Sequence, residues 1–149
     1  MTDYEVIIAQ AEALADGTVW NITLLANISA LLYESLEKVN WAGFYLLRDG
    51  ELMLGPFQGK PACTRIPVGK GVCGTAVKEE RIQRVEDVHN FSGHIACDAD
   101  SESEIVLPIR SDGKIIGVLD IDSPVKGRFS AEDEDGLQKI VQIIEANLQ

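Results

Sequence analysis

Two short apolar runs late in the chain constrain the fold more than any other feature. Glu104 opens the first run, Asp120 and Asp122 close the second, and Ser111-Asp112-Gly113 separates them. Apolar runs of strand length around such a turn sequence are typical of a β-hairpin. The chain is therefore expected to contain a sheet with antiparallel neighbouring strands.

Three carboxylates interrupt this hairpin. Side chains alternate along a strand, so Asp120 and Asp122 share one face of the sheet. With a three-residue turn, which we favour, Arg110 pairs with Lys114 and Glu104 lies opposite Asp120 on that face. A two-residue turn shifts the pairing by one residue and sends Glu104 to the other face. Opposed like charges destabilise a sheet, so convergence would indicate function, and the alternative is strand-end carboxylates that reach solvent.

Size and charge restrict the classes of partner. The chain has 149 residues, enough for one domain with a real core, and we expect a single domain over residues 1–149. Its apolar content of 46% and charged content of 25% are ordinary for a soluble protein. The net charge of −11 argues against nucleic acid and against an anionic membrane surface, because neither would meet a basic face.

The N-terminus lacks the basic region and apolar run of a signal peptide, and no stretch approaches the ~20 apolar residues of a membrane helix. We therefore expect a cytoplasmic protein. In that reducing compartment three cysteines do not form a structural disulfide framework, which leaves core thiols, metal ligands or redox chemistry.

Helices are predicted at both ends of the chain and strands between them. Apolar stripes predict helices over residues 3–15 and 19–37, and the second stripe is broad enough to make a homodimer plausible. This order predicts an α+β fold, with the terminal helices packed on one face of a mostly antiparallel sheet and long loops over the other. Between them we expect strands at 40–47, 52–54, 65–66 and 82–85, loops at 55–63 and 87–103, a helix at 72–79 and a closing helix capped by Ser130.

Cys63, Cys73 and Cys97 have different surroundings. Cys73 lies on the short predicted helix among apolar neighbours, where core packing explains it. Cys63 and Cys97 lie in polar, glycine-containing loops, where a thiol can react and meet a second thiol. There is no Cys-x-x-Cys pair. Only the spacing of His94 and Cys97 places an imidazole near a thiol, so zinc binding is the weaker alternative.

The acidic residues around Cys97 have two opposite effects. Negative charge raises the pKa of a thiol and makes the thiolate scarcer. Crowding also pushes one carboxyl toward its protonated form, which supplies a general acid, while the ionised remainder attracts an ammonium group. A thiol, a proton donor and an ammonium site together indicate an oxidised amino acid as substrate.

Five motifs are spread along the chain: Asn40-Trp41-Ala42-Gly43-Phe44-Tyr45, Gly55-Pro56-Phe57-Gln58-Gly59-Lys60, Gly69-Lys70-Gly71-Val72-Cys73-Gly74, Gly93-His94-Ile95-Ala96-Cys97-Asp98 and Gly117-Val118-Leu119-Asp120-Ile121-Asp122. Together they resemble the free methionine-(R)-sulfoxide reductases, which are GAF-domain enzymes. The resemblance extends from about Tyr4 to the C-terminal helix and implies a GAF-like fold.

The resemblance implies roles for the three thiols. Cys97 matches the nucleophile that attacks the sulfoxide sulfur and becomes a sulfenic acid. Cys63 matches the resolving thiol that closes a disulfide with Cys97, which thioredoxin then reduces. Cys73 matches a third, auxiliary cysteine. No metal or organic cofactor is implied.

The resemblance also implies a substrate pocket. Glu104, Asp120 and Asp122 match the acids that engage the ammonium group and the sulfoxide oxygen. Trp41 matches the aromatic wall against the substrate methyl, and Tyr45 shares its strand face. From the residues alone, Trp41 and Tyr45 could equally be core aromatics.

Two other functions remain open at this point. Many GAF domains bind small ligands without catalysis, although so acidic a pocket disfavours a cyclic nucleotide. A redox sensor, whose disulfide alters a surface for a partner, is the other. Stoichiometric oxidation without turnover would indicate the sensor.

Overall fold

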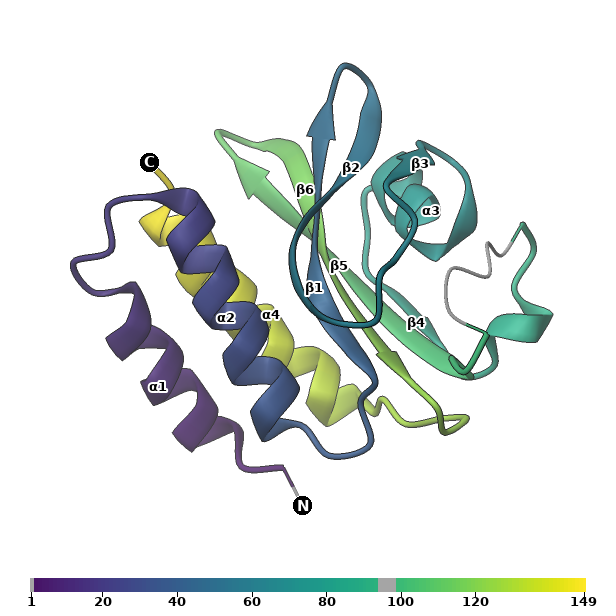
Figure 1. Cartoon of the computed structure of the whole chain (residues 1–149), viewed down its shortest axis with the longest axis horizontal. Helices are drawn as coiled ribbons and strands as arrows, with labels where there is room; N and C mark the ends of the chain where they lie inside the picture. The colour runs from purple at the N-terminus through teal and green to yellow at the C-terminus, as the bar shows by residue number, and fades with distance from the viewer. Residues whose placement is uncertain (1, 94–98) are drawn as a thin grey trace.

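The computed structural model describes residues 2–93 and 99–149, which form a six-stranded sheet in the order β3-β2-β1-β6-β5-β4 (Figure 1). Neighbouring strands are antiparallel. The strands are β1 (Trp41–Arg48), β2 (Glu51–Gly59), β3 (Arg65–Pro67), β4 (Gln83–Val85), β5 (Ser103–Ser111) and β6 (Lys114–Ser123). The helices are α1 (Tyr4–Ala15), α2 (Asn21–Ser35), α3 (Gly71–Glu79), α4 (Ala131–Asn147) and the 3-10 turn η1 (Val88–Asn90).

Helices cover the two faces of the sheet unequally (Figure 1). On one face α2 contacts β1 and β2, α4 contacts β5, and α1 packs on both of these helices. On the other face the short helix α3 contacts β5 and β6. The expected α+β arrangement, with terminal helices on one side of an antiparallel sheet, is thereby confirmed.

Alternation along β1 separates two apolar clusters. Ala42 and Phe44 face α1, α2 and α4 and are completely buried. Trp41 and Tyr45 face α3 and are also buried, together with Val118 of β6. One face of the sheet therefore supplies the main hydrophobic core, and the other carries the residues that the sequence marks as functional.

The turn between β5 and β6 differs from the expected one. Ser111 pairs with Lys114, so the loop is a two-residue turn and not a three-residue one. Its residues, Asp112 and Gly113, both have positive φ, 52° and 78°. Positive φ at both positions is the requirement of a type I′ turn, which matches the twist of antiparallel strands.

A β-bulge compensates for this turn. By itself the two-residue turn would place Glu104 and Asp120 on different faces of the sheet. The register shifts by one residue at Ile109/Arg110, where β6 contributes one extra residue, Ile116. As a result Glu104 pairs directly with Asp122 and lies diagonal to Asp120. The predicted turn was wrong, and so were the predicted pairings of Arg110 with Lys114 and of Glu104 with Asp120. The predicted convergence of the acids on one face is confirmed.

Strand β2 is longer than the sequence indicates, because it continues to Gly59 through part of the expected loop. The β1–β2 register is irregular between Gly43 and Tyr45, and Pro56 lies in this irregular stretch. Proline has no N–H to donate, and a bulge is one of the few sheet positions that does not require one. The proline that predicted a loop therefore marks a bulge within a strand.

The closing helix begins as predicted at Ser130. The Ser130 Oγ accepts a hydrogen bond from the Asp133 N–H at 3.1 Å, and the Asp133 carboxylate accepts one from the Ser130 N–H at 2.8 Å. This is a reciprocal capping box. The Tyr4 hydroxyl also donates to Asp133 at 2.6 Å and ties α1 to α4. Within the described residues, no helix combines the length and the apolar character that a membrane span requires.

Gly43 on β1 offers a test of how tightly the sheet is packed. A Cβ at this position would lie 2.2 Å from the Cβ of Phe57 on the paired strand. Forced overpacking of this kind costs about 1–3 kcal/mol. We expect Gly43→Ala to lower the free energy of unfolding by about 2 kcal/mol, measured in urea. In the control Gly55→Ala the nearest atom would be 3.1 Å away, and an equal loss there would contradict this reading.

Candidate active site

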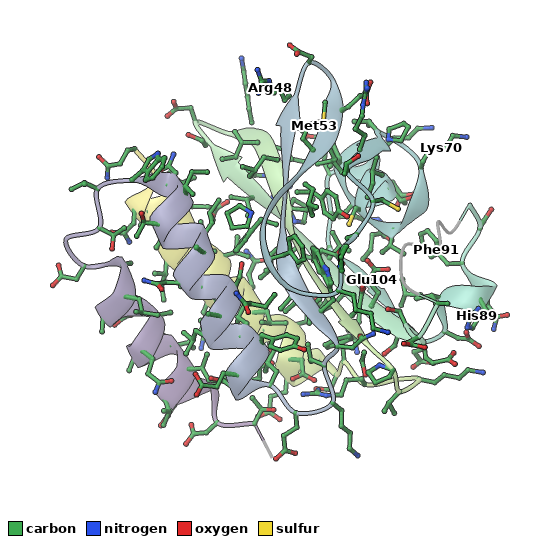
Figure 2. All side chains as sticks on the ribbon, viewed as in Figure 1. Arg48, Met53, Lys70, His89, Phe91 and Glu104 are labelled. Carbon is green, nitrogen blue, oxygen red and sulfur yellow. The ribbon has the colours of Figure 1, made fainter. Side chains whose placement is uncertain are left out.

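A cluster of buried carboxylates lies on the face of the sheet that packs against α3. Glu104 comes from β5 and Asp120 from β6, and only 8% and 5% of their surfaces are exposed. Asp122 shares this face as the direct partner of Glu104. Figure 2 labels Glu104 on the sheet, in the region between β1 and the segment that carries Phe91. Buried carboxylates at such spacing require protons or cations for compensation.

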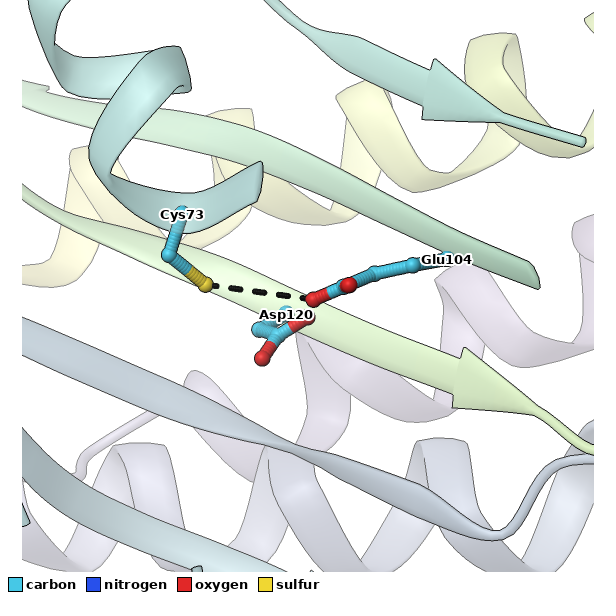
Figure 3. A group of neighbouring side chains, drawn as sticks. All are labelled: Cys73, Glu104 and Asp120. Carbon is cyan, nitrogen blue, oxygen red and sulfur yellow. Dashed lines mark hydrogen bonds between the residues drawn. The ribbon is translucent and has the colours of Figure 1, made fainter. Parts of the chain in front are cut away.

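Cys73 reaches this cluster from α3. Its Sγ donates a long hydrogen bond of 4.0 Å to Oε2 of Glu104 (Figure 3). Burial, and then the negative charge of Asp120, raises the pKa of the Cys73 thiol well above its ordinary value. A thiol that stays protonated is a poor nucleophile. The structure thus places Cys73 beside the acids, while its catalytic role stays a prediction.

Glu104 has a more strongly raised pKa than Asp120, its neighbour in the acid cluster. Burial, followed by the charges of Asp120 and Asp122, raises the pKa of Glu104 well above its usual value. Burial also raises the pKa of Asp120, but hydrogen bonds from Glu104 and Cys73 oppose that rise. Of the two carboxyls, Glu104 therefore has the stronger tendency to hold a proton, and Asp120 lies next to it. The Asp120 Oδ1 atom is buried and has no hydrogen-bond partner among the described residues, so it can accept a donor from a ligand.

An aromatic wall borders the acids. Trp41 pairs with Asp122 in the β1–β6 ladder, and its ring stacks on Tyr45 at a centroid distance of 5.9 Å. Trp41 also stacks on Phe57 at 5.1 Å. Sequence reasoning missed Phe57, because the Gly-Pro pair before it predicted a loop. A longer β2 would have indicated it, because Phe57 and Gly59 are then two residues apart on the face of the strand that Trp41 shares.

The segment 60–64, between β2 and β3, carries Cys63 and lies against this wall. The Tyr45 hydroxyl donates a hydrogen bond to the Cys63 carbonyl oxygen at 2.9 Å. The Trp41 Nε1–H donates to the Lys60 carbonyl oxygen at 3.1 Å. Cys63 is disulfide-bonded in this structure. Cys97, the predicted nucleophile, lies outside the described residues, so the pairing of Cys63 with Cys97 stays a prediction.

Among residues 2–93 and 99–149, two clusters contain the residue types that metal sites use, Cys73 with Glu104 and Asp120, and Asp87 with His89 and Glu102. In the second cluster, which is only partly buried, an ion pair of Lys126 with Asp87 at 3.3 Å and a hydrogen bond between His89 Nε2 and the Glu102 carboxylate at 2.9 Å account for the grouping. In the buried first cluster, the protons on Cys73 and Glu104 would have to leave before a metal could bind.

Comparison with known proteins gives a consistent picture. The sequence signature of the GAF domain matches residues 21–148. The free methionine-R-sulfoxide reductase of Escherichia coli (strain K12) is 64% identical over 133 residues, which cover 89% of this chain and 81% of that protein.

Solved structures agree with this result. The fRMsr of Staphylococcus aureus in complex with substrate matches with a TM-score of 0.96 at 56% identity, covering 100% of this chain and 97% of that one. The free methionine-R-sulfoxide reductase from Neisseria meningitidis in complex with its substrate matches with a TM-score of 0.94 at 42% identity, covering 97% and 87%. The chain therefore belongs to the GAF family and, within it, to the group of free methionine-R-sulfoxide reductases.

Proposed function

We propose that this protein reduces free L-methionine-(R)-sulfoxide to L-methionine. The observation that carries the proposal is the buried pair of Glu104 and Asp120. Burial raises the pKa of both carboxyls, that of Glu104 more strongly, and the Oδ1 atom of Asp120 lacks a partner among the described residues. Such a pair offers a proton donor for the sulfoxide oxygen and an acceptor for the ammonium of a free amino acid. A methionine sulfoxide within a peptide has no ammonium at that position, so the site favours the free amino acid.

Each residue of the pocket has a part in substrate binding under this proposal. Asp120 and Asp122 hold the ammonium group through charge-assisted hydrogen bonds. Glu104 donates its proton toward the sulfoxide oxygen, which makes the sulfur more electrophilic. Trp41 and Tyr45 offer an apolar surface to the methyl group and exclude water from the reacting atoms. The support for these roles is that all five side chains belong to one face of the sheet.

The two electrons come from thiols in the proposed chemistry. The sulfur of Cys97 attacks the sulfoxide sulfur and takes the oxygen as a sulfenic acid, and methionine leaves as the thioether. The thiol of Cys63 then displaces the sulfenic oxygen, which leaves as water, and a disulfide forms. Thioredoxin, a dithiol reductant of the cytoplasm, restores both thiols by exchange and is oxidised in turn.

The deciding experiment measures methionine release from the separate R and S sulfoxides of free methionine, with dithiothreitol as reductant. An N-acetylated R-sulfoxide serves as the control. We expect turnover of the free R form alone, which would establish the reaction, its stereochemistry and the need for the ammonium group. Release from none of the three would overturn the proposal and favour a ligand-binding GAF domain.

Substitution of Cys63 tests the resolving step. We expect Cys63→Ser, with thioredoxin as reductant, to release about one methionine per active site before recycling slows, because the sulfenic acid has lost its partner thiol. Rapid quenching followed by amino-acid analysis measures this burst. The variant Cys63→Ser/Cys73→Ser controls for substitution by the third thiol. Wild-type multiple turnover in that double variant would contradict an intramolecular disulfide.

A further inference from the structure

We infer that Trp41 and Tyr45, besides bordering the substrate pocket, are positioning residues for the loop that carries the resolving thiol. The inference rests on the proposed function, because it concerns the step after methionine has formed. The loop is the segment 60–64, which follows β2 and contains Cys63. Its position decides how often the Cys63 thiol can meet a sulfenic acid.

Two buried side chains of one strand hold this loop. Trp41 and Tyr45 lie four residues apart on β1, and each is only 2% exposed. The Trp41 indole donates to the Lys60 carbonyl at 3.1 Å, and the Tyr45 hydroxyl donates to the Cys63 carbonyl at 2.9 Å. Indole nitrogen is a donor only, and a buried donor without a partner is costly. The loop carbonyls are those partners, so the loop is fixed where the two donors require it.

The two hydrogen bonds can position the loop because β1, which carries both donors, is itself held in place. β1 is paired on both sides, with β2 and with β6, and β6 carries Asp120 and Asp122. The same two rings therefore border the acid cluster on one side and hold the Cys63 loop on the other. Because a paired central strand resists displacement, the loop keeps a fixed distance from the substrate pocket.

Two further contacts restrict the loop. The Leu54 N–H donates to the Thr64 carbonyl at 3.0 Å, which anchors the loop directly after Cys63. The Lys60 ammonium pairs with the Asp100 carboxylate at 2.8 Å and joins the loop to the chain just before β5. Both groups of that ion pair are largely exposed, so it adds little stability by itself. Apart from the disulfide that Cys63 forms in this structure, the buried donors of Trp41 and Tyr45 are thus the main tethers, and they are the ones that remain when the disulfide is reduced.

Disulfide closure is an intramolecular reaction, so its rate depends on how the two sulfurs are held. Removal of one tether widens the range of loop positions and lowers the fraction in which the thiols can react. Tyr45→Phe removes the hydroxyl but keeps the stacked ring, so the wall beside the acids is retained. The prediction is a slower closure of the disulfide relative to the release of methionine.

The experiment mixes reduced protein with one equivalent of free methionine-(R)-sulfoxide and quenches the reaction at short times. Amino-acid analysis gives the rate of methionine release, and alkylation of remaining thiols followed by mass spectrometry gives the rate of disulfide closure. We expect the ratio of closure to release to fall about three- to tenfold in Tyr45→Phe, the size of one lost hydrogen bond. Trp41→Phe, which removes the other donor, should lower the same ratio.

Tyr4→Phe is the matched control. It also removes a tyrosine hydroxyl with a hydrogen bond, the 2.6 Å contact with Asp133, but on the helical side of the sheet. A general loss of stability would affect both variants, whereas a tether of the Cys63 loop affects only Tyr45→Phe and Trp41→Phe.

The outcomes separate the inference from the function it rests on. A wild-type ratio in both Tyr45→Phe and Trp41→Phe, or an equal fall in Tyr4→Phe, overturns the positioning role while methionine release continues. Absence of methionine release from the wild-type protein instead overturns the proposed function. If Tyr45→Phe does not fold, as judged by circular dichroism, the ratio in Trp41→Phe decides.

Discussion

Replacement of Cys97 by serine is expected to abolish methionine release in every turnover, including the first. A serine hydroxyl at neutral pH has almost no oxyanion and cannot accept oxygen as a sulfenic acid, so the loss should exceed about 10³-fold. Amino-acid analysis after a single turnover measures it. The contrast with Cys63→Ser is the informative part, because that variant should still complete one turnover.

Full multiple turnover in Cys97→Ser would contradict the assignment of the thiols. Cys63 or Cys73 would then have to be the nucleophile. Cys73 is poorly suited, since burial and the neighbouring Asp120 raise the pKa of its thiol. Retained activity in Cys97→Ser would therefore direct attention to Cys63.

Asp120→Asn is expected to weaken substrate binding strongly. The variant loses the carboxylate beside Glu104, and with it the proposed charge-assisted hydrogen bond to the ammonium group. Truncation of one partner in a buried charge pair typically costs 2–5 kcal/mol, so kcat/KM should fall on the order of 100-fold, mainly through KM. Steady-state kinetics with the free R-sulfoxide measures this. Asp112→Asn, in the exposed turn of the same hairpin, is the control and should leave KM unchanged.

The same substitution should also change how stability depends on pH. A carboxyl whose pKa is raised in the folded state, as at Glu104, binds its proton more tightly there than in the unfolded chain. Its stabilisation is therefore present at low pH and is lost as the pH rises through the raised pKa. Asp120→Asn removes one charge that raises the pKa of Glu104, so the free energy of unfolding should fall less steeply with rising pH in this variant. Urea unfolding between about pH 5 and 9 measures both proteins, and identical pH profiles would show that the two carboxyls are not coupled.

The sequence predicted the convergence of the acids but not the way it is achieved. Alternation with a period of two places Asp120 and Asp122 on one face whatever the turn. The turn type and the bulge at Ile116 are two deviations that cancel. Asp112-Gly113 is a local signal for the two-residue turn, whereas no local pattern indicates the bulge. A Cβ on the adjacent Gly117 would lie 2.5 Å from the Tyr45 carbonyl oxygen, so packing against β1 is part of what the bulge accommodates. Such a contact between distant segments is invisible to a local reading.

The functional residues were predictable to different degrees. The carboxylates and the thiols stand out by residue type, whereas Trp41 and Tyr45 were assigned to the pocket only through a family resemblance. Their hydrogen bonds to the loop carbonyls at Lys60 and Cys63 could not be anticipated, because any residue supplies a carbonyl. The sequence predicted that crowding raises the pKa of one carboxyl, but identifying Glu104 as that carboxyl required its burial and its distances to the other acids.

The bulge at Ile116 also limits which insertions and deletions the β5–β6 hairpin can tolerate. Hairpin turns usually tolerate insertions and deletions, since they lie at the surface. Here, deletion of Ile116 alone would shift the pairing of β6 with β5 by one residue and exchange the two faces of β6. Asp120 and Asp122 would then point toward α1, α2 and α4, and Ile121 toward α3. Only changes that alter the turn and the bulge together keep each side chain of β6 on its present face of the sheet. The length of an exposed turn therefore determines which side chains of β6 face the main core, and a single-residue insertion or deletion there would exchange the residues of the proposed substrate pocket with those of the hydrophobic core.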